Sequence, residues 1–268
     1  MSKRNKIFSY IFLIAASALS IFPFLWMIIG ATNSSTEITK GKMTFGGELI
    51  NNITNLFNTV DVTAGIWMSI KVALLGTILT LIICSMAGYG FEVFKSKRSE
   101  KVMGFIMLSM MMPFAAIMVP LFKLFSKIGL LDTSMALILP GISTAYLIYF
   151  FRQNTKSFPY EILEAARVDG VGEYGSFFRI YLPTMKSTYA AAAIITFMNY
   201  WNSFLWPLVS IQSPDKRTLP LVISSLATAY SPDYGMIMVS IIITTIPSAL
   251  IFFLMQKNFV EGIVGSVK

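Results

Sequence analysis

Few residues of this chain have side chains that support chemistry, and the most informative of them gather in one polar segment. Glu164-Ala165-Ala166 is followed by Gly170 and, ten residues further on, by Ile180-x-Leu182-Pro183. The chain has no histidine, and its single cysteine, Cys84, has no partner for a disulfide or for a cysteine-based metal site. It also lacks the G-x-x-x-x-G-K-S/T loop that holds ATP phosphates. We therefore expect no metal site and no enzymatic activity in this chain.

The composition places this segment in a membrane protein. Hydrophobic residues make up 55% of the chain and charged residues 13%, which excludes an ordinary soluble domain. A membrane-spanning helix needs about 20 mainly apolar residues. Six stretches meet this need and predict an all-α polytopic membrane protein with six transmembrane helices: 7–30, 64–91, 102–122, 134–151, 188–210 and 235–256. The first run is too long for a signal peptide, so we interpret it as an uncleaved anchor.

The distribution of lysine and arginine orients these spans, because cytoplasmic loops carry an excess of both residues. Of the 21 basic residues, 14 lie on one side of the predicted membrane and six on the other, with Lys71 inside the second span. The richer side includes the segment that carries Glu164 and both termini, with Lys3, Arg4, Lys6, Lys257 and Lys268. We therefore predict cytoplasmic termini and a cytoplasmic loop at about 152–187. The basic residues form no single stripe, so we expect no nucleic-acid partner.

The residue types within the 152–187 loop predict two short helices joined by a tight turn. Ser157 and Pro159 suit a helix start, because serine caps free N–H groups and proline has none to lose there. The helix should continue through Arg167, and Gly170 supplies the left-handed conformation that commonly ends a helix. A second short segment then leads to Pro183.

The same loop offers a surface for another protein. Ala165 and Ala166 are small enough to let a second backbone approach, while Glu164, Arg167 and Asp169 provide polar contacts. A solvated amphipathic helix that ends at a glycine is the alternative, because such helices are common. The additional fixed spacing to Ile180-x-Leu182-Pro183 favours docking.

These motifs resemble those of the permeases of ABC importers, and the 164–170 segment resembles their EAA signature. The likeness is greatest to the carbohydrate uptake class, in particular to maltose-type second permease subunits, and covers roughly residues 64–268. Ser203 departs from it, where the family often has aspartate, as does Phe158, where isoleucine is usual. The matching stretches are Phe150–Gln153, Glu164–Gly170, Trp201–Leu208, Thr218–Pro220, Asp233–Gly235 and the Gln256, Phe259, Val260 and Gly262 set.

The resemblance implies a type I importer permease of a bacterial cytoplasmic membrane. Residues 1–63 would form a transmembrane helix with an extracytoplasmic loop, and residues 64–268 a five-helix core that pairs with a homologous permease. The implied partners are two ATPase subunits, which use ATP and Mg, and an extracellular or periplasmic solute-binding protein. The implied function is import of a sugar, with an oligosaccharide favoured, driven through the 152–187 loop.

The fifth predicted span holds candidate residues for a sugar pathway. Asn199, Asn202 and Ser203 share one helical face at i, i+3 and i+4 spacing, and Trp201 adds a flat apolar ring. Amides, hydroxyls and apolar surfaces together suit a sugar, which has both hydroxyls and C–H faces. The structural alternative places the tryptophan in the interfacial aromatic belt and the amides in helix contacts.

Two other functions remain open at this point. A stand-alone secondary carrier would need ionisable groups inside the membrane, and no carboxylate lies near the midpoint of a predicted span. An ABC permease for a polyol, a glycerol phosphate or a glycan fragment cannot be separated from a sugar permease by sequence. The polar loop from Thr32 to Thr63 is interpreted either as a contact for the binding protein or as a plain connector.

Overall fold

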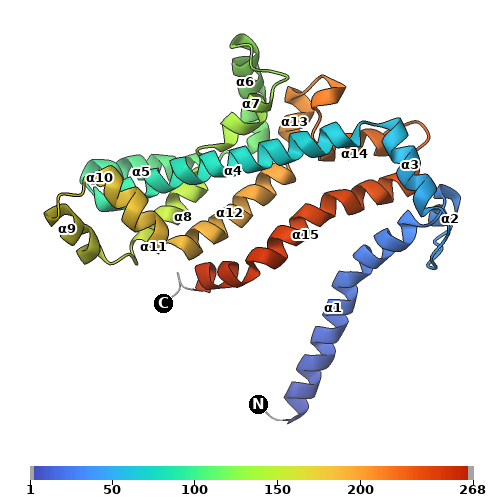
Figure 1. Cartoon of the computed structure of the whole chain (residues 1–268), viewed down its shortest axis with the longest axis horizontal. Helices are drawn as coiled ribbons and strands as arrows, with labels where there is room; N and C mark the ends of the chain where they lie inside the picture. The colour runs from blue at the N-terminus through green and yellow to red at the C-terminus, as the bar shows by residue number, and fades with distance from the viewer. Residues whose placement is uncertain (1–2, 265–268) are drawn as a thin grey trace. The chain divides into compact units, whose positions relative to one another are not determined.

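The computed structural model describes the backbone of residues 3–264, which form helices and turns without a strand (Figure 1). Side chains are described for residues 6–254 and Gln256. The interpretations that involve Lys3, Arg4, Lys257, Phe259, Val260, Gly262 and Lys268 therefore lie outside the described side chains. The chain divides into two compact units, Met1–Thr63 with Leu219–Pro247 and Ala64–Thr218 with Ser248–Lys268.

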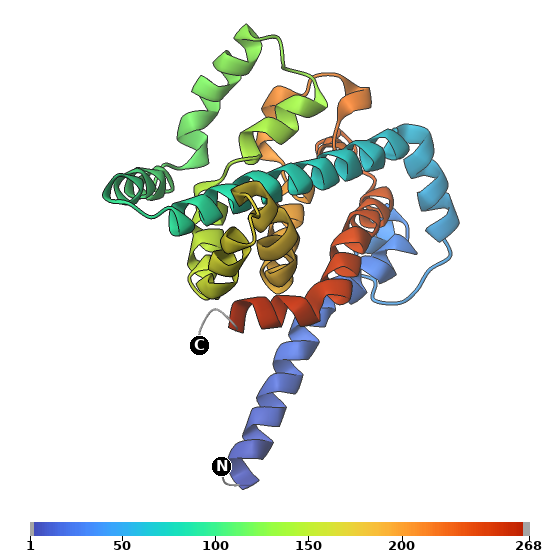
Figure 2. The ribbon, with the colours of Figure 1, turned by 60° about the vertical axis from the view of Figure 1, so that its left-hand side comes forward.

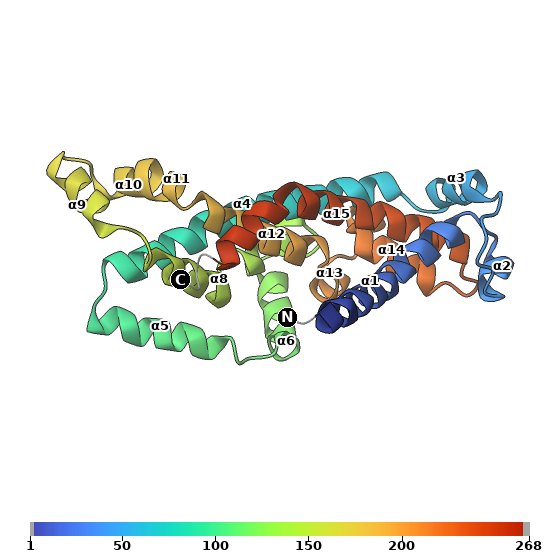
Figure 3. The same cartoon turned by 90° about the horizontal axis from the view of Figure 1, so that it is seen from below.

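The first unit contains α1 (Lys3–Ala31), α2 (Ser35–Thr39), α3 (Leu49–Thr59), α14 (Leu219–Ala227) and the beginning of α15 (Tyr234–Val264). Apolar side chains cover α1 and stay exposed along most of its length. Close packing between α1 and α15 is possible at Gly30, where a Cβ atom would lie 3.0 Å from Met238. Figure 3 shows α2 and α3 beside the end of α1.

The second unit is built around α4 (Val62–Val93) and α8 (Ala145–Thr155), with α12 (Lys186–Trp201) packed against them. Cys84, Phe151 and Ala192 are completely buried in its core. Gly88 allows α4 and α8 to touch, because a Cβ atom there would lie 2.6 Å from the Phe151 Cβ. Shorter elements of the unit include α5 (Lys97–Ser109), α6 (Phe114–Lys127), α7 (Ser134–Ile138), η1 (Leu139–Gly141), α13 (Leu205–Ser210) and η3 (Pro214–Lys216).

The predicted spans differ in how continuous they are. Within residues 3–264, three helices are long and apolar enough to cross a membrane unbroken: Lys6–Ala31, Val62–Val93 and Tyr234–Leu254. The predicted spans at 102–122 and 134–151 are instead bent pairs, α5 with α6 at 100° and α7–η1 with α8 at 45°. The break between α5 and α6 falls at Pro113, which cannot donate a helical hydrogen bond. The predicted span at 188–210 consists of α12 and α13, separated after Trp201.

Candidate functional site

The 152–187 loop begins with a sharp turn out of α8. The Ser157 hydroxyl donates to the Asn154 carbonyl at 2.7 Å, and the side chain of Phe158 is buried. Pro159 then occupies the cap position of α9 (Tyr160–Val168), which has no side-chain cap. The prediction that Ser157 caps this helix was therefore wrong, because its hydroxyl closes the preceding helix instead.

Helix α9 ends in a tight turn at Gly170, as the sequence predicted. Gly170 has φ +80°, a conformation that costs other residues about 1–2 kcal/mol. Its N–H donates to the Arg167 carbonyl at 3.1 Å, and the N–H of Val171 donates to the Ala166 carbonyl at 2.9 Å. This pair of bonds is the Schellman arrangement, which satisfies the last carbonyls of a helix.

An aromatic cluster holds the loop against the end of α4. Tyr89 of α4 packs edge-on against Phe177 and Tyr181, with ring centroids 5.3 and 4.8 Å apart, and Leu163 of α9 is buried in the same cluster. The Tyr181 and Thr155 hydroxyls share a hydrogen bond at 2.7 Å. The chain passes this cluster through α10 (Glu173–Ser176), the π-helical turn η2 (Phe177–Tyr181) and α11 (Leu182–Thr184). Figure 2 shows these elements (olive to gold) beside α4.

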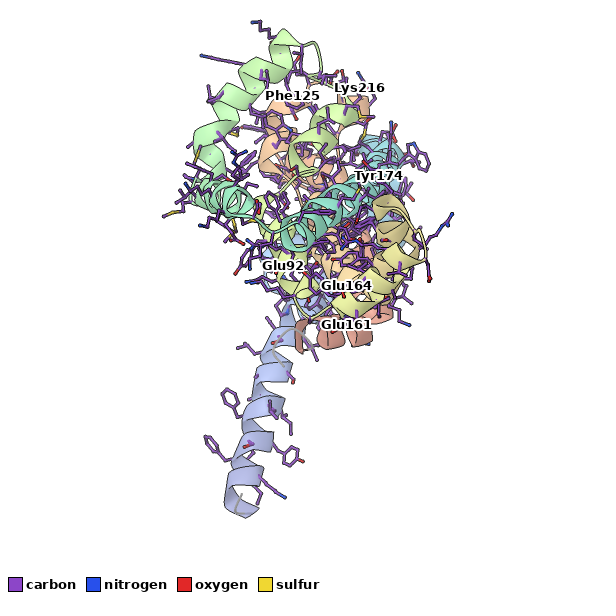
Figure 4. All side chains as sticks on the ribbon, turned by 90° about the vertical axis from the view of Figure 1, so that its left-hand side faces the viewer. Glu92, Phe125, Glu161, Glu164, Tyr174 and Lys216 are labelled. Atoms are coloured by element: carbon purple, nitrogen blue, oxygen red, sulfur yellow. The ribbon has the colours of Figure 1, made fainter. Side chains whose placement is uncertain are left out.

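The two alanines of the signature face different environments. Ala165 and Glu164 are exposed, whereas Ala166 is 6% exposed and lies on the inner side of α9. Glu161 is also exposed on this helix (Figure 4). Arg167 bridges the turn to Glu173, with N–O distances of 2.9 and 3.2 Å. This contact raises the pKa of the Arg167 guanidinium above its usual value.

The other loop residues that were predicted to contact the ATPase are also partly exposed and partly half-buried. Asp169 is exposed and closes α9, with its N–H donated to the Ala165 carbonyl. Ile180 and Leu182 are half-buried, and Pro183 is exposed. The loop thus exposes charged side chains, together with apolar ones such as Val168, above an aromatic base.

A buried arginine at the start of the loop was not singled out by its sequence spacing. The Arg152 Nε donates to Glu92 Oε2 at 3.0 Å, and its guanidinium also contacts the Glu100 carboxylate. Arg152 is 7% exposed, and the Glu92 side chain is nearly as buried. The ion pairs join α8 to the end of α4 and to the first turn of α5, so that three helices meet where the loop begins.

A second candidate site is a cavity of about 800 Å³ between α4, α8, α12 and α13. Three of the four predicted pathway residues, Asn199, Asn202 and Ser203, line it. Trp201 does not: its ring is 1% exposed and stacks on Phe197 at 5.7 Å. The other lining residues are Thr80, Phe114, Leu137, Pro140, Gly141, Thr144, Tyr146, Leu147, Thr196, Tyr200, Phe204, Leu205 and Trp206.

Tyr200 organises the wall of this cavity, although the i, i+3 and i+4 spacing did not select it. Its hydroxyl donates to the Ile138 carbonyl at 3.0 Å and lies 3.1 Å from the Thr80 hydroxyl. Gly76 and Gly141 leave room for this side chain, because a Cβ atom at Gly76 would lie 2.6 Å from the ring and one at Gly141 would lie 2.5 Å from the hydroxyl oxygen. The Asn202 amide donates to the Met198 carbonyl at 3.0 Å, whereas the Asn199 side chain is exposed in the cavity wall.

Comparison with known proteins decides what kind of molecule carries these sites. A family model described as the inner membrane component of binding-protein-dependent transport systems matches residues 82–264. The chain belongs to this family. The lactose transport system permease protein LacG of Rhizobium radiobacter is 53% identical to this chain, over 98% of this chain and 96% of LacG. The resemblance to ABC importer permeases of the carbohydrate uptake class is thereby confirmed.

Other relatives have different named solutes. The arabinooligosaccharides permease AraQ of Bacillus subtilis is 34% identical, over 96% of this chain and 94% of AraQ. The sn-glycerol-3-phosphate permease UgpE of Pectobacterium atrosepticum is 28% identical, over 98% of this chain and 97% of UgpE. A solved bacterial ABC transporter involved in import of the acidic polysaccharide alginate matches with a TM-score of 0.83 at 18% identity, over 97% of this chain and 99% of that chain.

The family and this structural match establish the type I permease fold and a multi-pass protein of the inner membrane. The family and the relatives are transport permeases, and this chain is a transport permease subunit.

Proposed function

We propose that this chain forms half of the translocation pathway of an ATP-driven sugar importer and couples it to a separate ATPase through the 152–187 loop. The observation that carries this proposal is the 53% identity, over 98% of the chain, to a lactose permease. The proposed partners of this chain are a second homologous permease, two ATPase subunits that use ATP and Mg, and an extracellular or periplasmic solute-binding protein. Both termini and the loop face the cytoplasm.

The loop is suited to transmit motion because its exposed face and its buried base lie on the same short helix. Glu164 is exposed and enters no ion pair within the described part of the chain. Leu163, one residue away, is buried in the aromatic cluster with Tyr89 of α4. A force applied to α9 by the ATPase therefore reaches α4 directly, and it reaches α8 through the hydrogen bond between Tyr181 and Thr155.

The cavity favours a neutral, hydroxyl-rich solute. Amides, hydroxyls and aromatic rings line it, and none of its lining residues is charged. A phosphorylated glycerol is the second candidate, because glycerol-phosphate permeases are among the relatives. Transport of a phosphate dianion through an uncharged cavity is disfavoured, since protein sites for phosphate supply Arg, Lys or helix N-termini. A stand-alone secondary carrier is the least supported alternative.

The docking role is tested by reversing one charge on the outer face of α9. We expect Glu164→Lys to abolish sugar uptake while the protein remains in the membrane, because a lysine repels whatever cation pairs with the glutamate. Glu161→Lys is the matched control, since Glu161 is an exposed glutamate on the same helix outside the signature. Uptake of labelled sugar by cells, normalised to membrane-inserted protein, measures both. Equal uptake by the two variants would overturn the docking assignment.

The pathway role is tested at Asn199, whose amide faces the cavity. A hydrogen bond between neutral groups contributes about 0.5–1.5 kcal/mol, so Asn199→Ala should slow uptake by about 2–10-fold. Basal ATP hydrolysis by the complex should stay unchanged. Gln212→Ala, an exposed amide that does not line the cavity, is the control. Unchanged uptake in Asn199→Ala would show that Asn199 has a structural role and is not part of the sugar pathway.

A further inference from the structure

The segment between α1 and α4, residues 32–61, is folded and is not a plain connector. Ser34 and Glu37 form a reciprocal capping box at the start of α2. Lys42 bonds to Glu37 at 2.7 Å and, with the Ser34 contacts, lowers the pKa of that carboxyl to about 2. We refer to residues 32–61 as the α2–α3 segment.

Hydrogen bonds to backbone carbonyls fix helix α3 to the end of α1. The buried Asn52 amide donates to the carbonyls of Ala31, at 2.9 Å, and Asn33, at 3.0 Å. The N–H of Glu48 donates to the Thr32 carbonyl at 2.9 Å. The Ala31 carbonyl is one of those that the last turn of α1 leaves without a helical partner, and the other two follow it directly. Helix α3 therefore lies where the span Lys6–Ala31 ends.

The same helix also touches the beginning of α15. Asn52 lies so close to Gly235 that a Cβ atom there would come within 2.4 Å of the Asn52 side chain. The Thr59 hydroxyl donates to the Met236 sulfur at 3.7 Å. The span Tyr234–Leu254 begins at this point. Because two spans meet α3 at their ends, α3 lies at a membrane surface.

Three faces can be distinguished around α3 at 100° per residue. Asn52 and Leu56 are buried against the protein. An adjacent stripe is apolar and exposed: Ile50 is 76% exposed, Ile53 38% and Phe57 48%, with Leu49 beside them. The opposite face is polar and exposed, with Asn51, Thr54, Asn55 and Asn58.

We propose that α3 is an interfacial helix, which lies in the membrane surface with Ile50, Ile53 and Phe57 among lipid acyl chains. A helix with separate apolar and polar faces takes this position when it binds a membrane. Helix α1, to which α3 is hydrogen-bonded, likewise exposes apolar side chains along most of its length. In this position the helix links the ends of α1 and α15 at one membrane surface.

Apolar burial alone supports this contact, because α3 contains no charged residue. Interfacial helices bind through buried apolar area and through attraction of basic residues to anionic lipid, and only the first applies here. The position of α3 should therefore be the same in neutral and in anionic membranes.

Spin labels on two faces of α3 test the proposal in the complete transporter reconstituted in vesicles. Ile50→Cys places a label on the apolar stripe, and Asn58→Cys places one on the polar face. Both positions are exposed, so neither label disturbs the fold. Cys84 is the only cysteine and is fully buried, so the unmodified chain serves as the blank. Accessibility to oxygen reports lipid, and accessibility to a water-soluble nickel chelate reports water.

We expect the label at position 50 to be accessible to oxygen and protected from nickel, and the label at position 58 to show the reverse. The pattern should be equal in phosphatidylcholine vesicles and in vesicles that contain phosphatidylglycerol. Nickel accessibility at position 50 would contradict the proposal, because the stripe would then face water. Protection of position 50 from both reagents would also contradict the proposal, since a protein would then cover the stripe. If position 50 becomes protected only when the solute-binding protein is added, that protein is the one that covers the stripe.

Discussion

The 152–187 loop and the α2–α3 segment both connect spans through short helices, yet they are held by different means. The 152–187 loop rests on an aromatic cluster around Tyr89 and on the ion pairs of Arg152, and it exposes a charged face. The α2–α3 segment rests on asparagine amides bonded to backbone carbonyls, and it exposes an apolar stripe. The first surface suits a soluble partner protein, whereas the second suits lipid.

The difference explains why only one of the two regions was recognisable in the sequence. The role of Glu164 or Gly170 depends on residue type at a fixed local spacing, and such a signal is visible in one chain. The role of Asn52 depends on carbonyls at positions 31 and 33, about 20 residues away. An asparagine in a polar segment is equally typical of a surface turn, so its anchoring function had no local signal.

The largest effect is expected at the base of the 152–187 loop. Arg152→Met should destabilise the protein by about 3–5 kcal/mol, because it leaves the buried carboxylate of Glu92 without its partner. The melting temperature of the detergent-purified complex measures this loss. Arg98→Met, at an exposed arginine of α5, is the control and should have little effect. If both variants melt alike, the ion pairs do not hold the base of the loop.

A smaller loss is expected in the α2–α3 segment. Asn52→Ala removes the donor to two carbonyls, and an unsatisfied buried polar group costs about 1–3 kcal/mol. The same melting experiment applies, with Asn55→Ala on the exposed face of α3 as control. Protease accessibility of residues 32–61 should also rise in Asn52→Ala. A stable segment in that variant would show that the amide bonds are not what fixes α3.

The smallest effect concerns the turn after α9. Gly170→Ala should cost about 1–2 kcal/mol, because alanine is strained at φ +80°. Gly172→Ala is a close control: neither position has an atom within 4 Å of a new Cβ, and Gly172 has φ −67°. Uptake should fall in the first variant and persist in the second. Similar uptake in both would mean that the turn geometry does not matter for coupling.

The helix–turn–helix of the 152–187 loop could be predicted because proline and glycine restrict the backbone locally. The course of the spans could be predicted less well. Apolar length alone does not reveal that α5 and α6 meet at 100° or that a break separates α12 from α13, because it reports composition and not the direction of the backbone. Pro113, Pro120 and Pro247 were all candidates for a kink, and of these only Pro113 lies between two helices, whereas Pro120 and Pro247 lie inside α6 and α15.

The residues of the candidate pathway could also be predicted only in part. Helical spacing placed Asn199, Asn202 and Ser203 on one face, and all three line the cavity. Trp201 was included because of its ring, but it turns toward Phe197 on the other side of α12. Tyr200 was passed over, although Gly76 and Gly141 make room for it, because contacts between α12 and distant glycines leave no pattern within a single helix.

The most direct test of the account is ATP hydrolysis by the complete transporter in lipid vesicles, measured with a panel of sugars and with the Glu164→Lys and Glu161→Lys variants. We predict that one sugar, presented by the binding protein, stimulates hydrolysis in the wild type and in Glu161→Lys, and that Glu164→Lys loses this stimulation. The absence of ATPase activity with every sugar, or equal stimulation in all three proteins, would contradict the claim that this loop couples a sugar permease to its ATPase.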